Sequence, residues 1–320
     1  MLFRLNYTLK PMDLGEPGHL DIVLARKSGL VNVQIRKLEE IELVKGLNSG
    51  DLSCMATTER YTAVKEEVLF MAMKDKLLSR IRSIVDEVGN ELDECVKSTV
   101  SSIRWVRGLT SAHDPIRLGS DVEWSLDNVT WKRVPQKIRF HVSMDFPTII
   151  KLKPEQIVAI KSLVESETAE PLGHTMLSEA WSQRSHNPRS AIVIGIAAAE
   201  TGWKEFVVRF LPETEWLLRN IQSPPLVKML RELMPLIPTP LRYGGKKPEI
   251  PLRLIELVEK GVTLRNDIVH GKRVVLKRET LDEVLGAVRD LLYLLDGFGG
   301  MTWAGQNLSH ETIQALKGDG

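Results

Sequence analysis

Apolar and polar residues alternate one by one in several segments of the first part of the chain. Between residues 20 and 35 the segments HLDIVLA and VNVQI alternate on either side of RKSG, whose glycine suits a turn. Further alternating segments are VEWSL and VTWKRV around residue 128, and KIRFHVSMDF at 137–146. A period of two places every second side chain on one face of a strand, so the pattern predicts β-hairpins.

Helical spacing interrupts these strands. From about Thr62 to Val106 one apolar stripe contains Leu77, Leu78, Ile81, Ile84, Val85, Val88, Leu92, Val96, Val100 and Ile103. Residues three and four apart share a helix face, so the stripe predicts one long helix, or two helices broken near Gly89.

After Pro154 the strand pattern stops and helical patterns follow. Asn187 and Pro188 supply an N-cap and a first-turn proline for PRSAIVIGIAAAETGWKEFVVRF, and SPP at 223–225 opens another helix. The predicted organisation is an α+β domain of hairpins and a long helix over residues 1–150, followed by an all-α helical bundle over 151–320.

Several helix ends in this second half carry their own signals. The helix IPLRLIELVEKGVTLRNDIVH is expected to end at His270, with Gly271 directly after it. Thr280 and Glu283 have the spacing of a capping box for LDEVLGAVRDLLYLL, and Gly297 is expected to follow the last residue of that helix.

Composition describes a globular protein with no strong global charge. The chain has 320 residues, of which 43% are hydrophobic and 27% charged, enough for two domains that each bury a core. Its formal net charge is only +1, so binding of nucleic acid would require a local basic patch.

The two cysteines, Cys54 and Cys95, stand singly and lack the spacing of a zinc site or a disulfide framework. No apolar run approaches the length of a membrane span, and MLFRLNYTLK lacks the features of a signal peptide. We therefore expect a cytoplasmic protein without membrane contact, metal site or cofactor.

The segment LRNDIVHGK at 264–272 concentrates candidate chemistry at a helix end. The helix C-terminus favours a protonated imidazole at His270, and Asn266 lies four residues earlier on the same face. Arg265 lies roughly 140° around the helix from His270, so the two would converge more easily on something bound across a subunit interface. A histidine that moves protons and a guanidinium that stabilises a phosphorane suit metal-independent cleavage of RNA.

A basic segment follows directly. Positions 261 to 280 contain five Lys or Arg residues and two acids, Asp267 and Glu279, which is a local charge of +3. Lys272 and Arg273 are the candidate RNA phosphate-binding residues because they adjoin His270.

These residues resemble the HEPN domains (higher eukaryotes and prokaryotes nucleotide-binding), whose hallmark is an Arg-x4-6-His motif, often with Asn after the Arg. The helix NPRSAIVIGIAAAETGWKEFV, with alanines leading to Glu200, is similar to the second major helix of that family, and the resemblance covers residues 170 to 297. It implies a helical bundle that forms homodimers and cuts RNA to 2′,3′-cyclic phosphate ends, as in toxin–antitoxin and antiviral defence systems. By position Arg265 and His270 would be catalytic, Asn266 would orient them or the phosphate, and Glu200 would support them.

One departure concerns regulation. The toxin partners of nucleotidyltransferases in this family often carry a Tyr two residues after the His, where this chain has Lys272. Control through modification of that tyrosine is therefore not expected, although a neutralising or sensing protein partner remains part of the hypothesis.

Structural interpretations of the same residues stay open. Glu200 lies among alanines and isoleucines, where an unpaired carboxylate is costly, so a basic partner is expected and Arg265 is the candidate. Asn266 could satisfy a backbone group and His270 could cap its helix. The domain would then be a non-catalytic interaction or assembly module, or an RNA- or nucleotide-binding protein without cleavage.

Other candidates favour structural roles. Trp181, Trp203 and Trp216 lie on helical segments and are expected in the core or a dimer interface. His141 is expected at the surface of its strand. The first domain shows no nucleophile and base in a recognisable arrangement, and its position suggests sensing, substrate selection or partner binding.

Overall fold

The computed structural model describes residues 1–9, 12–13, 18–26, 28–37, 52–60, 79–109, 116–119, 122–133, 150–220, 225–240 and 248–318. The chain divides into a first unit, Met1–Arg104 with Asp114–Ala169, and a second unit, Trp105–His113 with Glu170–Gly320. The division comes later than the expected boundary at residue 150. Helix α3 (Pro154–Glu165) contacts strand β3 (His19–Arg26), and Arg26 pairs with Glu167, so this segment packs with the first unit.

The first unit is built on an antiparallel sheet with strand order β3-β4-β5-β1-β7-β8, in which β6 also pairs with β1. Its further strands are β1 (Leu2–Leu9), β4 (Gly29–Lys37), β5 (Leu52–Glu59), β6 (Ile116–Gly119), β7 (Glu123–Ser125) and β8 (Lys132–Arg133). A separate parallel pair joins β2 (Met12–Asp13) to β9 (Ile150–Lys151). The predicted hairpins are confirmed at β3–β4 and β7–β8. The strand expected at 137–146, with His141, lies outside the described residues.

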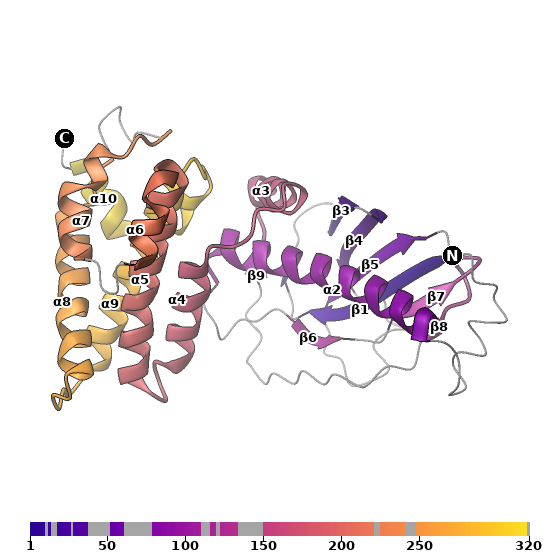
Figure 1. Cartoon of the computed structure of the whole chain (residues 1–320), viewed down its shortest axis with the longest axis horizontal. Helices are drawn as coiled ribbons and strands as arrows, with labels where there is room; N and C mark the ends of the chain where they lie inside the picture. Colours follow the sequence, from indigo (N-terminus) through magenta and orange to yellow (C-terminus); the bar gives the residue numbers. More distant parts are fainter. Residues whose placement is uncertain are drawn as a thin grey trace. The chain divides into compact units, whose positions relative to one another are not determined.

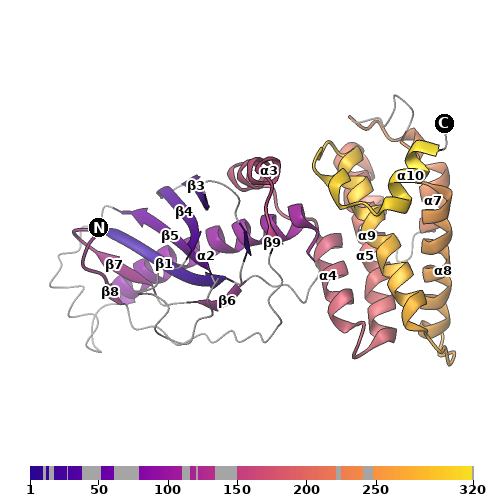
Figure 2. The same cartoon turned by 180° about the vertical axis from the view of Figure 1, so that it is seen from behind.

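Alternation builds the core of this unit. Ile22, Val33, Ala56 and Leu5 pair in register across four neighbouring strands, and all four are buried. Helix α2 (Ser79–Arg107) lies across one face of the sheet (Figures 1 and 2). Because α2 continues through Gly89, the single-helix prediction is confirmed for this part; its expected portion before residue 79 is not described.

The second unit is a helical bundle, as predicted. Its long helices are α4 (Leu172–Gln183), α5 (Pro188–Phe210), α8 (Leu252–Val269) and α9 (Arg278–Phe298). Shorter segments are η3 (Pro212–Thr214), α6 (Glu215–Asn220), α7 (Leu226–Glu232), η4 (Met234–Leu236), η6 (Ala304–Asn307) and α10 (His310–Gly318). Helices α4 and α5 run antiparallel, as do α8 and α9, and α5 is also antiparallel to α8 (Figure 1). No described helix has the length and apolar character needed to span a membrane.

Glycines let the long helices approach closely. A Cβ added at Gly173 of α4 would lie 2.9 Å from the Cα of Gly202 of α5, so the two backbones are nearly in contact there. A Cβ at Gly261 of α8 would lie 2.6 Å from side-chain atoms of both Ile196 of α5 and Val284 of α9. Gly261 therefore marks the point where α8 packs against its two neighbours.

Helix starts agree only partly with their sequence signals. The side chain of Asn187 accepts a hydrogen bond from the Ser190 N–H at 3.1 Å, which confirms the predicted N-cap. The capping box at Thr280 is wrong: α9 begins at Arg278, with Lys277 as N-cap and no capping side chain. Glu283 instead accepts a hydrogen bond from Lys260 of α8 at 3.1 Å.

The end of α9 is also later than predicted. Gly297 is buried inside the helix, and the left-handed residue after the helix is Gly300, with φ +99°. The Gly300 N–H bonds to the Gly297 carbonyl at 3.0 Å and the Met301 N–H to the Asp296 carbonyl at 3.0 Å. These two bonds have the pattern of a Schellman cap.

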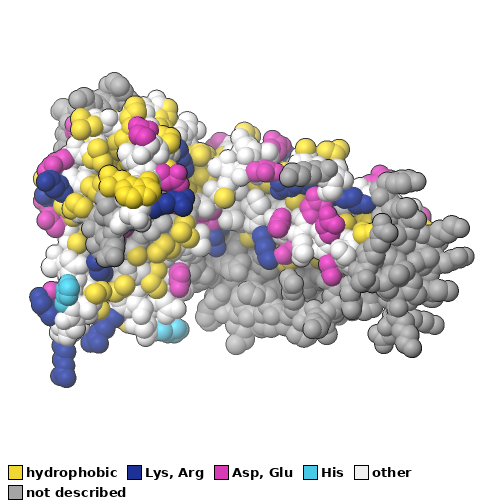
Figure 3. Space-filling view, viewed as in Figure 1, with side chains coloured by type: hydrophobic (Ala, Val, Ile, Leu, Met, Phe, Trp, Pro, Cys, Tyr) yellow, Lys and Arg dark blue, Asp and Glu magenta, His cyan; other side chains and the backbone are white. Residues whose placement is uncertain are grey.

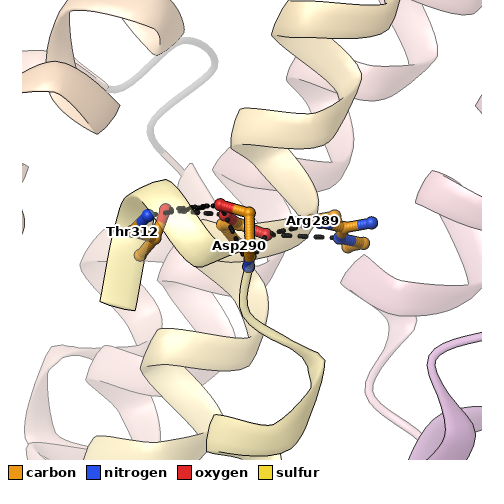
Figure 4. A network of polar contacts seen from close by, with 4 residues as sticks. Arg289, Asp290 and Thr312 are labelled. Carbon is orange, nitrogen blue, oxygen red and sulfur yellow. Dashed lines mark hydrogen bonds and ion pairs between the residues drawn. The ribbon is translucent and has the colours of Figure 1, made fainter. Parts of the chain in front are cut away.

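A buried carboxylate fastens α10 to α9 (Figure 4). Asp290 accepts hydrogen bonds from the Ser309 N–H at 3.2 Å, the Thr312 hydroxyl at 2.6 Å and Arg289 Nη2 at 2.9 Å. The negative charge is therefore fully engaged by donors at the start of α10 and by its own neighbour.

A second buried network lies within the helical unit and was not indicated by the sequence. It includes Trp105, because the last turn of α2 belongs to this unit. Asp296 Oδ2 accepts from the Trp105 indole N–H at 2.8 Å and lies 2.8 Å from His174 Nε2. The Tyr293 hydroxyl donates to the Trp105 carbonyl at 2.8 Å. Residues from α2, α4 and α9 thus share one polar cluster inside an apolar core.

Cys54 and Cys95 are both free thiols, and both are buried. Burial raises the pKa of the Cys54 thiol to about 12, so this sulfur carries almost no thiolate near neutral pH. Trp203 is buried in the core, whereas Trp216 is 74% exposed on α6, so for Trp216 only the expectation of a dimer interface remains.

Candidate functional site at the end of helix α8

The end of α8 holds His270 and its loop in a defined geometry. Gly271 takes the left-handed conformation, with φ +77°, which confirms its predicted position after the helix. The Lys272 N–H bonds to the Asp267 carbonyl at 2.8 Å and the Gly271 N–H to the Ile268 carbonyl at 3.0 Å. This Schellman cap satisfies the terminal carbonyls through backbone groups. The imidazole of His270 is therefore not required as a cap.

Arg265 of α8 forms an ion pair with Glu200 of α5, as the burial argument predicted. Their side chains are 16% and 14% exposed, so the pair is largely removed from water. Gly261 of α8 approaches Ile196 of α5, and Arg265 and Glu200 each lie four residues further along their own helices. In antiparallel helices both side chains tilt back toward this contact, because each tilts toward the N-terminus of its own helix.

Glu200 responds to opposing influences. Burial raises the pKa of its carboxyl group, while the positive charges of Arg265 and Lys204 lower it, and the effect of burial is larger. The carboxylate is therefore held in its charged form chiefly by Arg265.

Asn266 adds a second contact to the guanidinium. Its side-chain oxygen accepts a hydrogen bond from Arg265 Nη1 at 3.0 Å, while Arg265 Nη2 forms the ion pair with Glu200. Asn266 itself is exposed. The arginine is thus oriented from two sides.

His270 lies apart from this group. It is exposed, and its imidazole makes no hydrogen bond or ion pair with any other described residue. The structure shows no such bond between Arg265 and His270 within the described part of the chain. One chain thus brings Arg265, Asn266 and Glu200 together and leaves His270 free at the helix end.

The loop after His270 differs from residue to residue. Lys272 Nζ lies 2.5 Å from Asp267 Oδ1, so its charge is partly neutralised. Arg273 and Lys277 are exposed and form no ion pair with the residues described. Lys and Arg side chains gather at this end of the bundle (Figure 3). Of the two predicted phosphate-binding residues, Arg273 is the one available to a ligand without breaking a contact.

The available groups define what the site can do. Nowhere in the described ranges do three or more His, Cys, Asp or Glu side chains gather in a way that could hold a metal ion. The end of α8 offers an imidazole that can accept or donate a proton, and guanidinium and ammonium groups that can bind phosphate.

Sequence reasoning missed a second basic segment at the same end of the bundle. His186 and Arg189, in the turn from α4 to α5 and at the start of α5, are both exposed. They lie about 80 positions before His270, and only the antiparallel helix pairs bring the two turns to one end. The residues RSHNPR themselves, without an acid among them, were the available signal.

Comparison of the chain with protein-family models, with curated proteins and with solved structures gave no match in any of the three. The resemblance to HEPN domains therefore rests on the residues of the motif and on the order of the helices around it.

Proposed function

We propose that the helical unit is a metal-independent endoribonuclease of HEPN type, in which His270 transfers protons and Arg265 stabilises charge on the phosphate. The observation that carries the proposal is an exposed imidazole that bonds to no other described residue, at the capped end of α8 and beside a basic loop. The terminal carbonyls of α8 are satisfied by backbone N–H groups, so the imidazole is available to a substrate. A toxin or phage-defence role follows from the resemblance alone.

The reaction uses the RNA's own nucleophile. The 2′-oxygen attacks the neighbouring phosphorus, the bond from phosphorus to the 5′-oxygen breaks, and the products are a 2′,3′-cyclic phosphate and a 5′-hydroxyl. His270 accepts the proton of the 2′-hydroxyl, and a protonated His270 from a second copy gives a proton to the leaving 5′-oxygen. Two imidazoles are needed at once, which is why the proposal includes a homodimer formed by the helical unit.

Arg265 acts on the charge of the phosphorane. Its guanidinium has five N–H donors, and the contacts to Glu200 and Asn266 leave others for a phosphate oxygen. Glu200 and Asn266 limit the rotation of the side chain, so less conformational freedom is lost when phosphate binds. They act as positioning residues.

The test is incubation of a labelled structured RNA pool in EDTA with wild type, His270→Ala and His310→Ala. His310 is another exposed histidine, on α10, and serves as the matched control. We expect cleavage by wild type and His310→Ala and at least a 100-fold loss in His270→Ala, the lower range for a general acid–base group. Equal cleavage by all three, or none by wild type, would contradict the proposal, provided circular dichroism shows equal folding.

The ion pair of Arg265 with Glu200 supports a second candidate, a non-catalytic interaction or assembly module. A buried pair that links α5 to α8 is what a purely structural role predicts. The double variant Glu200→Gln with Arg265→Gln retains a polar contact but removes both charges. Cleavage at the wild-type rate by this variant would assign the pair to structure alone, whereas loss of cleavage with an intact fold assigns Arg265 to the reaction.

A further inference from the structure

Two turns of the helical unit share one end of the bundle. The turn between α4 and α5 spans residues 184–187, and the loop between α8 and α9 spans 270–277. Figures 1 and 2 show both at the same end, seen from opposite sides. Arg184 Nη1 lies 3.7 Å from Asp282 Oδ1, so the end of α4 contacts the start of α9.

Positive charge is concentrated on these turns. We call this surface the basic end, which consists of Arg184, His186, Arg189, His270, Lys272, Arg273, Lys277 and Arg278. Segments 182–190 and 267–282 together contain six Lys or Arg residues and three Asp or Glu residues, in a chain whose net charge is only +1. The two segments therefore carry a net positive charge even when every acid in them is ionised.

The acids of this surface are mostly engaged by its other cations. Asp267 pairs with Lys272, and Asp282 lies within 3.8 Å of Arg278 as well as near Arg184. The third acid, Glu279, is exposed. His186, Arg189, Arg273 and Lys277 are exposed and have no hydrogen bond or ion pair from their side chains to the rest of the described chain. These four side chains contribute nothing visible to the fold and are available to an anion.

The composition of the surface selects the kind of anion. Residues 184–189 and 270–278 contain no Phe, Tyr or Trp, and their only aromatic rings are the imidazoles of His186 and His270, so the cations and phosphates would supply most of the contact. A lipid surface would require large apolar side chains among the cations, and the largest exposed there are Val269 and Val275. Two turns on separate helix pairs suit an extended phosphate chain better than a single small anion.

We propose that the basic end binds the phosphate backbone of single-stranded RNA without base selectivity, with Arg189 and Lys277 as phosphate contacts beyond the α8 motif. This inference deepens the proposed function, since the bound strand passes His270. It concerns binding alone and does not require cleavage.

The test measures binding to a fluorescent 2′-O-methyl RNA oligomer by anisotropy over a series of salt concentrations. This probe has no free 2′-hydroxyl, so binding is measured without cleavage. The variants are Arg189→Ala with Lys277→Ala, and the control Arg253→Ala with Lys317→Ala. The control removes two exposed cations from the start of α8 and from α10, away from the basic end (Figure 1).

We expect the first variant to bind several-fold more weakly, with a slope of log affinity against log salt shallower by about 1.4, or about 0.7 for each phosphate contact on a single strand. The control should match wild type. Unchanged affinity and slope, an equal loss in the control, or binding to phosphatidylserine vesicles in place of RNA would overturn the inference.

The same variants separate this inference from the proposed function. Binding that depends on Arg189 and Lys277, in a protein that never cuts unmodified RNA, supports the RNA surface and refutes the nuclease. Cleavage by wild type that the double variant leaves unchanged in rate and KM supports the nuclease and refutes the surface.

Discussion

Glu200 and His270 show how differently two polar residues of one site depend on their surroundings. Glu200 lies in an alanine-rich helix, and the cost of burying its charge was enough to predict Arg265 as its partner across 65 positions. His270 is exposed at the end of α8 and has no such partner among the described residues. The fold accounts for Glu200, whereas the imidazole of His270 is open to solvent and to ligands.

Replacement of Glu200 by Gln should change how stability depends on pH. Burial raises the pKa of Glu200 in the folded state above its ordinary 4.5, so the folded protein holds this proton more tightly than the unfolded chain does. Its contribution to stability is therefore complete below about pH 4.5 and is lost as pH rises through the folded pKa. Relative to wild type, Glu200→Gln should gain unfolding free energy between pH 4 and pH 7 in urea titrations. A relative loss would mean that Arg265 lowers the pKa more than burial raises it.

Replacement of Asp296 by Ala should weaken the helical unit strongly. The change leaves His174 and the Trp105 indole N–H buried without their shared acceptor. We expect a loss of about 3 kcal/mol or more in unfolding free energy, typical of removing one partner from a buried pair. The exposed His310→Ala change should stay within about 0.5 kcal/mol of wild type. A similar small effect for both variants in denaturant titrations would show that the cluster contributes little.

At the scale of elements, local signals located most helices and strands but not all of their ends. Asn187 and Gly271 mark the ends that their residue types predicted, because cap geometry depends on adjacent residues. The signals for α9 failed at both ends. The helix begins before the capping box at Thr280 and Glu283, and it ends after Gly297. Glu283 contacts Lys260 of another helix, and such a partner is not visible in the local sequence.

Two glycines should respond in opposite directions to replacement by Ala. Gly271 has φ +77° with nothing within 4 Å of an added Cβ, so Gly271→Ala should cost about 1 kcal/mol through backbone conformation alone. Gly286 lies inside α9 with equally open space, so Gly286→Ala should stabilise by about 0.5–1 kcal/mol. Thermal unfolding of the two variants checks the pair, and shifts of the same sign would contradict the assignment.

At the scale of the whole molecule, the order of an antiparallel sheet followed by a mostly helical unit was predictable from the period of apolar residues. The extent of the site was not. His186 and Arg189 join the surface around His270 only through the antiparallel packing of α4 with α5 and α8 with α9. The last turn of α2 joins the helical unit through Trp105, which no sequence pattern indicated.

A site shared between two copies makes a prediction about mixtures. His270→Ala protein should be inactive, because its dimers lack both imidazoles. Refolding wild type with an equal amount of His270→Ala should leave about a quarter of the activity of the same total amount of wild type, since only a quarter of the dimers would hold both imidazoles. Light scattering should show twice the 36.1 kDa mass of one chain. Activity near half of the wild-type value would contradict the shared site, because it would show that one imidazole is enough for each site.

The central claim is that the end of α8 cuts RNA through the 2′-hydroxyl. The most direct measurement is to identify the fragment ends formed in EDTA from an RNA oligomer and from the same oligomer with 2′-deoxy sugars throughout. The account predicts 2′,3′-cyclic phosphate and 5′-hydroxyl ends from the RNA, and no cleavage of the 2′-deoxy strand. Fragments with 3′-hydroxyl and 5′-phosphate ends, cleavage of the 2′-deoxy strand, or intact RNA would contradict it.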